Sequence, residues 1–144
     1  MKHFTTEDTE DAEESQNQLQ VLNQMSGKII DAAMAVHTAL GPGLLESVYE
    51  ICLCYELNKR GLHTQTQVQL PVCYDSLKID AGYRLDLLVE NSIIVELKAV
   101  EKLLPIHQAQ LLTYLKLSDK FIGLLINFNS VHLRDGIKRM VHRL

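Results

Sequence analysis

The stretch of sequence that decides the fold reads YRLDLLV at positions 83–89, ENS at 90–92 and IIVELKAV at 93–100. It predicts two apolar strands joined by a short polar turn. A strand that is buried in a sheet rarely carries a charge, yet Asp86, Glu96 and Lys98 interrupt this pair. Because an unpartnered charge is costly to bury, these three side chains are the first candidates for a functional site.

The length of the turn decides whether the three charges share a face. Side chains alternate along a strand, so Glu96 and Lys98 point to the same face of the sheet. A three-residue loop over 90–92 places Asp86 opposite Glu96 on that face, whereas a two-residue loop shifts Asp86 by one position. The three-residue loop needs a residue in the left-handed conformation, to which Asn91 is suited.

Two carboxylates on one face repel each other, and a divalent cation would remove that repulsion. Mg²⁺ prefers one or two carboxylates together with water and phosphate oxygens, and it can generate a hydroxide nucleophile. A lysine beside it can orient the attacking water or offset the developing charge. The alternative is an ion pair of Lys98 with Asp86 or Glu96 on a solvated sheet face, which is the more common outcome for an isolated E-x-K on a strand.

Two predicted helices carry polar side chains that could reach the same face. A helix over 105–117 holds Gln110 and Tyr114 four residues apart, and therefore on one side. A helix over 44–60 holds Glu46 in its first turn, where the helix dipole favours a carboxylate. Each feature also has a purely structural explanation, because an exposed helix face accounts for Gln110 and Tyr114, and the dipole alone accounts for Glu46.

The remaining elements predict an α/β protein with a mixed sheet covered by helices. A first helix is expected to begin at Ser26 as its N-cap and to end at Leu40, before the Gly-Pro-Gly at 41–43. On the second helix we expect a core-facing stripe of Leu45, Val48, Cys52 and Tyr55, with a second stripe beside it of Glu46, Tyr49, Glu50 and Leu53. Further strands are expected at 64–72, 121–128 and 137–141, the last at an edge, with a polar turn region at 73–80 that could pair as strands.

The length of 144 residues predicts one domain, preceded by a tail. Residues 1–17 are predicted to be an acidic, disordered or weakly ordered tail, and 18–144 the folded domain. The tail holds six acids against one lysine, which leaves 12 acids and 13 bases in the remainder. The folded part is therefore near neutral, and its net charge neither indicates nor excludes a nucleic-acid partner.

The composition argues against export and against a membrane span. No apolar run approaches the ~20 residues that a membrane helix needs, and the first residues lack the apolar centre of a signal peptide. The chain has three cysteines, an odd number without metal-type spacing. We therefore expect a cytoplasmic protein with no membrane partner.

Four segments, in their order along the chain, resemble a known family. They are GPGLLESVYE at 41–50, YRLDLLV at 83–89, VELKAV at 95–100 and LLINFN at 124–129. The arrangement looks like the PD-(D/E)XK nuclease superfamily, and more closely like the small bacterial GxxExxY protein family, whose pattern falls on Gly43, Glu46 and Tyr49. The Gln-x-x-x-Tyr element at 110–114 resembles the RecB-like branch of the superfamily. The resemblance covers roughly residues 26–141, and it departs from the pattern at Leu85, where the superfamily often has a proline.

The resemblance implies a restriction-endonuclease-like α-β-β-β-α-β core within residues 18–144. It implies that Asp86, Glu96 and the backbone carbonyl of Leu97 bind Mg²⁺ or Mn²⁺, with Glu46 as a further ligand and catalytic acid. It also implies that Lys98 is the catalytic lysine. Substrate binding would then fall to Gln110, Tyr114 and Tyr49.

The function implied is that of a metal-dependent nuclease that hydrolyses phosphodiester bonds in nucleic acid, DNA rather than RNA. The partner expected is nucleic acid, and a homo-oligomer is compatible with the sequence. The main alternative is a binding module for nucleic acid or protein that has a nuclease-like fold and no catalysis. A third alternative, with less support, is a purely oligomeric structural protein.

Overall fold

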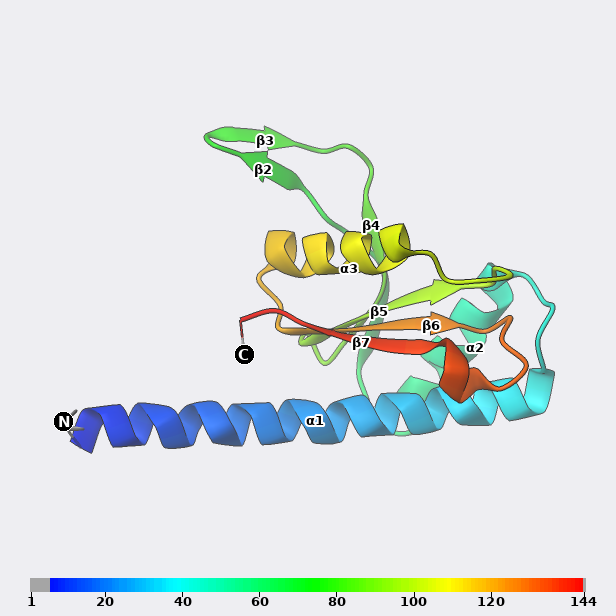
Figure 1. Cartoon of the computed structure of the whole chain (residues 1–144), viewed down its shortest axis with the longest axis horizontal. Helices are drawn as coiled ribbons and strands as arrows, with labels where there is room; N and C mark the ends of the chain where they lie inside the picture. The colour runs from blue at the N-terminus through cyan, green and yellow to red at the C-terminus, as the bar shows by residue number, and fades with distance from the viewer. Residues whose placement is uncertain (1–5, 144) are drawn as a thin grey trace.

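A five-stranded mixed sheet in the order β1-β4-β5-β6-β7 is the centre of the fold, described over residues 6–143 in a computed structural model (Figure 1). The helices are α1 (Thr6–Leu40), α2 (Glu46–Lys59) and α3 (Pro105–Ser118), with a 3-10 turn η1 (Leu133–Gly136). The strands are β1 (Thr64–Gln69), β2 (Val72–Tyr74), β3 (Leu77–Ile79), β4 (Arg84–Val89), β5 (Ile93–Lys98), β6 (Ile122–Asn127) and β7 (Ile137–Val141). Only β5 and β6 are parallel, and the other neighbours in the sheet are antiparallel. This confirms the predicted α/β class and its mixed sheet.

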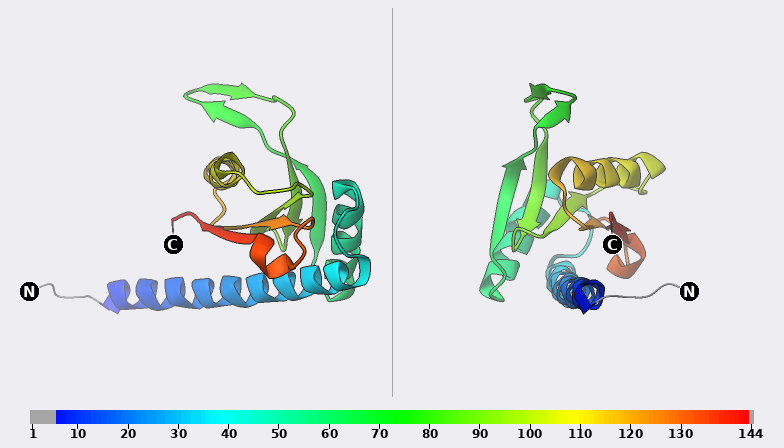
Figure 2. Two further views of the ribbon diagram at one scale, coloured as in Figure 1. Left: turned by 45° about the vertical axis from the view of Figure 1, so that its right-hand side comes forward. Right: turned by 90° about the vertical axis from the view of Figure 1, so that its left-hand side faces the viewer.

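The helices cover the two faces of the sheet unequally. Residues of α1 and α2 form one apolar core with the sheet, and α3 forms a second core on the opposite face (Figure 2). Along β5, Val95 and Leu97 belong to the α1–α2 core, while Ile94 belongs to the α3 core. Because side chains alternate along a strand, Glu96 and Lys98 share the parity of Ile94 and lie on the α3 side.

The turn between β4 and β5 has the length that puts the charges on one face. Val89 pairs with Ile93, which leaves a three-residue loop over 90–92, the longer of the two alternatives considered. Glu90 and Asn91 have φ angles of 51° and 52°, and the Ser92 N–H donates to the carbonyl of Val89 at 2.9 Å. The left-handed conformation expected of Asn91 is therefore present, and Glu90 adopts it as well. Two successive left-handed residues match the twist of an antiparallel strand pair.

The first helix is longer than the sequence predicted. Helix α1 begins at Thr6 rather than at Ser26, and its N-terminal half projects past the sheet (Figure 1). The prediction of a disordered or weakly ordered arm is wrong for residues 6–17, while 1–5 lie outside the described residues. Residues 6–26 contain neither glycine nor proline and are rich in Glu and Gln, which favour helix. The division into a tail at 1–17 and a domain at 18–144 stays a prediction.

Helix α2 turns a different stripe to the core than the one we expected. Leu45 and Tyr55, from the predicted core stripe, are 73% and 70% exposed. The buried residues are Tyr49, Leu53 and Leu57. Both stripes carry apolar residues, so periodicity alone could not select between them, and packing against the sheet decided the outcome.

The later elements follow the prediction closely. Pro105 is the first residue of α3, β6 is buried along its whole length, and β7 is an edge strand. Residues 72–79 form a separate two-stranded hairpin, β2–β3. Cys52, Cys54 and Cys73 are free thiols. Within residues 6–143 no helix is both long and apolar enough to cross a membrane.

Candidate active site

Asp86 on β4 and Glu96 on β5 meet where these two strands stop pairing. The paired register ends at Leu87 with Val95. One residue further, the Asp86 N–H donates to Glu96 Oε1 at 3.1 Å, and the Leu97 N–H donates to Asp86 Oδ2 at 2.9 Å. Each carboxylate therefore bonds the backbone of the opposite strand, and the two acidic side chains fill the space that a regular ladder would close.

The Glu96 carboxyl is held in its protonated form at neutral pH. Its residue is only 6% exposed. Burial raises the pKa of Glu96 to about 9, and the neighbouring charge and hydrogen bond of Asp86 act in the same direction. The Asp86 N–H and the charge of Lys98 oppose this rise in the pKa without cancelling it. The pair therefore holds a proton where a cation would otherwise balance its charge.

Helix α2 adds two more carboxylates beside this pair. Loss of solvent raises the pKa of Glu46, and the charge of Asp86 raises it further. Burial also raises the pKa of Glu50, and Asp86 contributes to that shift too. Glu50 accepts a hydrogen bond from Gln67 Nε2 at 2.6 Å. The sequence analysis did not place Glu50 in the site, although its position four residues after Glu46 on the same stripe could have indicated it.

Lys98 is the cation that acts on this acidic group. Its charge lowers the pKa of Glu46 and of Glu96, so it lies within electrostatic reach of both helix α2 and strand β5. Among the salt bridges formed by residues 6–143, none joins Lys98 to an acid. The alternative of a simple surface ion pair is therefore not what the structure has, and the acidic side chains around Lys98 outnumber it even with Glu96 protonated.

The donor atoms at this position suit a hard divalent cation. Asp86 and Glu96 supply carboxylate oxygens, and the Leu97 carbonyl faces β4 because its N–H does. Oxygen donors together with excess negative charge are what Mg²⁺ and Mn²⁺ prefer. Within the described chain, no three His, Cys, Asp or Glu side chains are already gathered as a metal site. The oxygen donors therefore suit Mg²⁺ or Mn²⁺. A bound cation would compete with the two hydrogen bonds that the carboxylates now accept from backbone N–H groups.

Helix α3 brings Tyr114 within electrostatic reach of the carboxylate pair, and Gln110 lies one turn earlier on the same helix. Tyr114 is 8% exposed. Burial raises the pKa of Tyr114, and nearby acidic groups, Glu96 first among them, raise it further. Gln110 is exposed one turn earlier on the helix and lines a groove together with Tyr114.

Tyr49, which the resemblance assigns to substrate binding, is completely buried and bonds the loop before α2. It has no exposed surface and stacks on Phe128 with ring centroids 4.7 Å apart. Its hydroxyl donates to the Gly41 carbonyl at 2.5 Å and accepts from the Leu44 N–H at 3.1 Å. Both hydrogen bonds of the phenol hydroxyl are therefore made within the protein. They fix the loop that leads into Glu46 at the start of α2.

Asn127 is a positioning residue that the sequence analysis missed. It is 3% exposed at the end of β6. Its Nδ2 donates to the Val100 carbonyl at 2.9 Å, and its Oδ1 accepts from the Val100 N–H at 3.1 Å. The Phe128 N–H donates to the Lys98 carbonyl at 2.9 Å. The sequence signal was a polar residue at the end of an apolar run. Such a side chain is buried and must find hydrogen-bond partners nearby.

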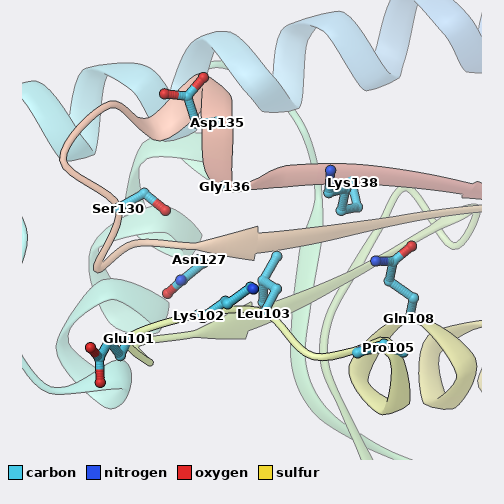
Figure 3. A pocket seen from close by; sticks show the side chains of 10 residues that line it. All are labelled: Glu101, Lys102, Leu103, Pro105, Gln108, Asn127, Ser130, Asp135, Gly136 and Lys138. Atoms are coloured by element: carbon cyan, nitrogen blue, oxygen red, sulfur yellow. The ribbon is translucent and has the colours of Figure 1, made fainter.

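A hollow of about 470 Å³ opens beside these strand ends (Figure 3). It is bordered by the segment after β5, the first turns of α3, and the η1–β7 segment. Asn127, which pairs with Lys98 across the sheet, is part of its wall. Lys102 and Lys138 line the hollow, and both are exposed. Asp86 and Glu96 are not among its lining residues, so the hollow adjoins the carboxylate pair and does not contain it.

Comparison with known proteins identifies one family. A family model of the PD-(D/E)XK nuclease superfamily matches residues 23–140. The match spans every residue of the site described above. No curated protein and no solved structure matches the chain.

Proposed function

This chain belongs to the PD-(D/E)XK nuclease superfamily, and we propose that it is a metal-dependent nuclease that hydrolyses phosphodiester bonds, with DNA as the favoured substrate. The observation that carries the proposal is the contact between Asp86 and Glu96 at the point where β4 and β5 separate. Two acids and a lysine on one face of a sheet are groups that metal-assisted phosphodiester hydrolysis can use.

We assign the following roles to the residues. Asp86, Glu96 and the Leu97 carbonyl would hold Mg²⁺ or Mn²⁺, with Glu46 and Glu50 as acids behind them. When bound, such a cation supplies Lewis-acid stabilisation of the phosphate and a more acidic water. Lys98 faces the same side as Glu96, where an ammonium group can orient a water or offset the charge of the attacked phosphate.

The hollow beside the strand ends offers a path for the nucleic-acid backbone. Lys102 and Lys138 line it, together with the acids Glu101 and Asp135 (Figure 3). Neither lysine takes part in a salt bridge within residues 6–143. Exposed lysines without an acidic partner suit phosphate contacts that carry no sequence information. We therefore expect little sequence specificity.

The finer family assignment is to the GxxExxY proteins. Its support is local, because Gly43 has a φ angle of 97° and the Tyr49 hydroxyl bonds the same loop. This loop sets the start of α2 and with it the position of Glu46. A cytoplasmic location and a homo-oligomer stay predictions.

The second candidate function is a binding module without catalysis. It is favoured by one observation, namely that Asp86 and Glu96 already satisfy each other's strands through backbone hydrogen bonds. Carboxylates whose hydrogen bonds are already satisfied by the protein do not require a cation. The two candidates differ in whether metal supports cleavage, and the same experiment separates them.

The test is a cleavage assay on labelled single-stranded DNA, duplex DNA and RNA with Mg²⁺, Mn²⁺ or EDTA. Wild-type protein should cleave at least one substrate with metal and none in EDTA. Glu96→Ala and Lys98→Ala should abolish cleavage while circular dichroism shows an intact fold. Lys28→Ala, at an exposed position on α1, serves as the matched control and should cleave normally. Absence of cleavage on every substrate with either metal would favour the binding module.

A further inference from the structure

A second groove lies between α3 and the base of the β2–β3 hairpin. Its volume is about 450 Å³. The hairpin stands above α3 in the view of Figure 1. The groove is lined by Val72, Tyr83, Ile106, Ala109, Gln110, Thr113, Tyr114 and Leu117. Neither the cleavage chemistry nor the phosphate path uses most of these residues.

The lining combines flat aromatic surface with apolar walls and a polar edge. The rings of Tyr83 and Tyr114 lie with their centroids 6.1 Å apart at an angle of 57°. Tyr83 is 44% exposed and Ile106 is 66% exposed, so large apolar surfaces face water here. Gln110 adds an amide that can both donate and accept a hydrogen bond. Apolar walls with a few polar groups are typical of a ligand site.

Tyr114 links the groove to the candidate active site. Tyr114 lines the groove and also lies close enough to the acidic pair for Glu96 and Asp86 to raise its pKa. Tyr83 immediately precedes β4, the strand that carries Asp86. At about 3.4 Å per residue, Tyr83 and Asp86 are roughly 10 Å apart along the strand. A ligand in the groove would therefore lie beside the position at which a phosphate would react.

We propose that this groove binds an unpaired nucleobase of the substrate, stacked on Tyr83 and hydrogen-bonded at its edge by Gln110. The inference rests on the proposed function for nucleic acid as the ligand, and it narrows the substrate class to strands with a single-stranded segment. In a duplex the base faces are stacked and the pairing edges are occupied, so only an unpaired base can enter. Aromatic stacking tolerates every base, which agrees with the low sequence specificity expected above.

The experiment measures binding separately from cleavage. Fluorescence anisotropy is recorded with a labelled single-stranded DNA of mixed sequence and with its blunt duplex, in EDTA and at one fixed salt concentration. Wild type should bind the single strand more tightly than the duplex. Tyr83→Ala should weaken single-strand binding roughly tenfold, since it removes the aromatic surface on which the base stacks. Its duplex affinity should not change.

Two variants provide the matched controls. Tyr83→Phe retains the ring and should stay within about twofold of wild type, because the stacking surface is preserved. Tyr55→Ala removes a tyrosine that is 70% exposed on α2, outside the groove, and should have no effect. Should Tyr83→Ala fail to fold, Ala109→Leu fills the groove from an exposed position on α3 and should weaken single-strand binding in its place.

Three results would overturn the inference. The first is an unchanged single-strand affinity in Tyr83→Ala, or in Ala109→Leu if that variant replaces it. The second is an equal loss of affinity for single strand and duplex, and the third is no single-strand binding by wild type. A protein segment or a second copy as the true occupant would give the first of these. Failure of the base site and failure of the proposed nuclease function give different results. Loss of binding in Tyr83→Ala together with no cleavage by wild type would reject the nuclease and keep the base site, and the reverse pattern would reject the base site alone.

Discussion

Asp86 and Glu96 meet at the end of the β4–β5 pair, where the Glu96 carboxylate accepts the Asp86 N–H and the Asp86 carboxylate accepts the Leu97 N–H. The acids thereby end the backbone ladder and meet in one place. Burial and mutual repulsion raise the pKa of Glu96 to about 9, so the pair carries a proton at neutral pH. The predictions below follow from this contact and from the residues that hold it in position.

The first prediction concerns stability against pH without metal. A carboxyl whose pKa is raised on folding binds a proton more tightly in the native state, so stability falls as pH rises. For Glu96 the fall should run from about pH 5 to about pH 9, at up to ~1.4 kcal/mol per pH unit. Glu96→Gln should remove this slope while retaining an oxygen acceptor for the Asp86 N–H. Urea unfolding at several pH values measures it. Glu101→Gln, an exposed acid, should behave as wild type, and an unchanged slope in Glu96→Gln would contradict the assignment.

The second prediction links metal binding to proton release. Carboxylates must be deprotonated to bind a cation, so Mn²⁺ should displace the proton held by Glu96. Calorimetric titration in buffers of different ionisation enthalpy should show proton release near neutral pH and tighter binding as pH rises. Asp86→Asn should abolish binding, and Asp31→Asn, at an exposed position on α1, should not. Binding without proton release would show that the cation sits elsewhere.

The third prediction concerns Tyr49. Its hydroxyl bonds the Gly41 carbonyl and the Leu44 N–H in a partly buried loop, so Tyr49→Phe leaves both groups without that partner. We expect a loss of about 1–3 kcal/mol in the free energy of unfolding. Cleavage should also slow, because the loop before Glu46 loosens. Tyr55→Phe, on the exposed side of α2, should change neither quantity. Normal stability in Tyr49→Phe would refute this structural role.

The fourth prediction concerns Asn127. Asn127→Leu should lower the free energy of unfolding by about 2 kcal/mol or more, because it leaves the Val100 N–H and carbonyl without their partner. Asn17→Leu, at an exposed position on α1, should cost less. Thermal unfolding of both variants decides the point. Equal losses would mean that Asn127 does not fix the segment after Lys98.

The sequence carried enough information to predict the sheet and the position of the acids. Strand alternation follows from local rules, whereas two lengths were open for the turn between the strands, and the register shows the three-residue loop over 90–92. The buried strand β6 and the first residue of α3 were likewise visible in the composition of their segments. These features depend on contacts between near neighbours along the chain.

The features that could not be predicted from the sequence depend on tertiary packing. Which stripe of α2 faces the sheet is decided by contacts with β4 and β5, and this is why Tyr49 is buried and Tyr55 exposed. Ser26 looked like an N-cap, but it lies inside a helix that the preceding polar residues extend. Glu50 joins the acids only because α2 lies against the strand ends. The groove beside Tyr83 required the fold to be known.

The measurement that tests the central claim most directly is the cleavage rate of a labelled DNA strand by wild-type protein and by Asp86→Asn, with Mg²⁺ or Mn²⁺ and with EDTA. Asp86→Asn keeps the size of the side chain and an oxygen acceptor for the Leu97 N–H, so the fold should survive. We predict metal-dependent cleavage by wild type, none in EDTA, and background rates for the variant. Cleavage by Asp86→Asn at the wild-type rate, or no cleavage by wild type with either metal, would contradict the account.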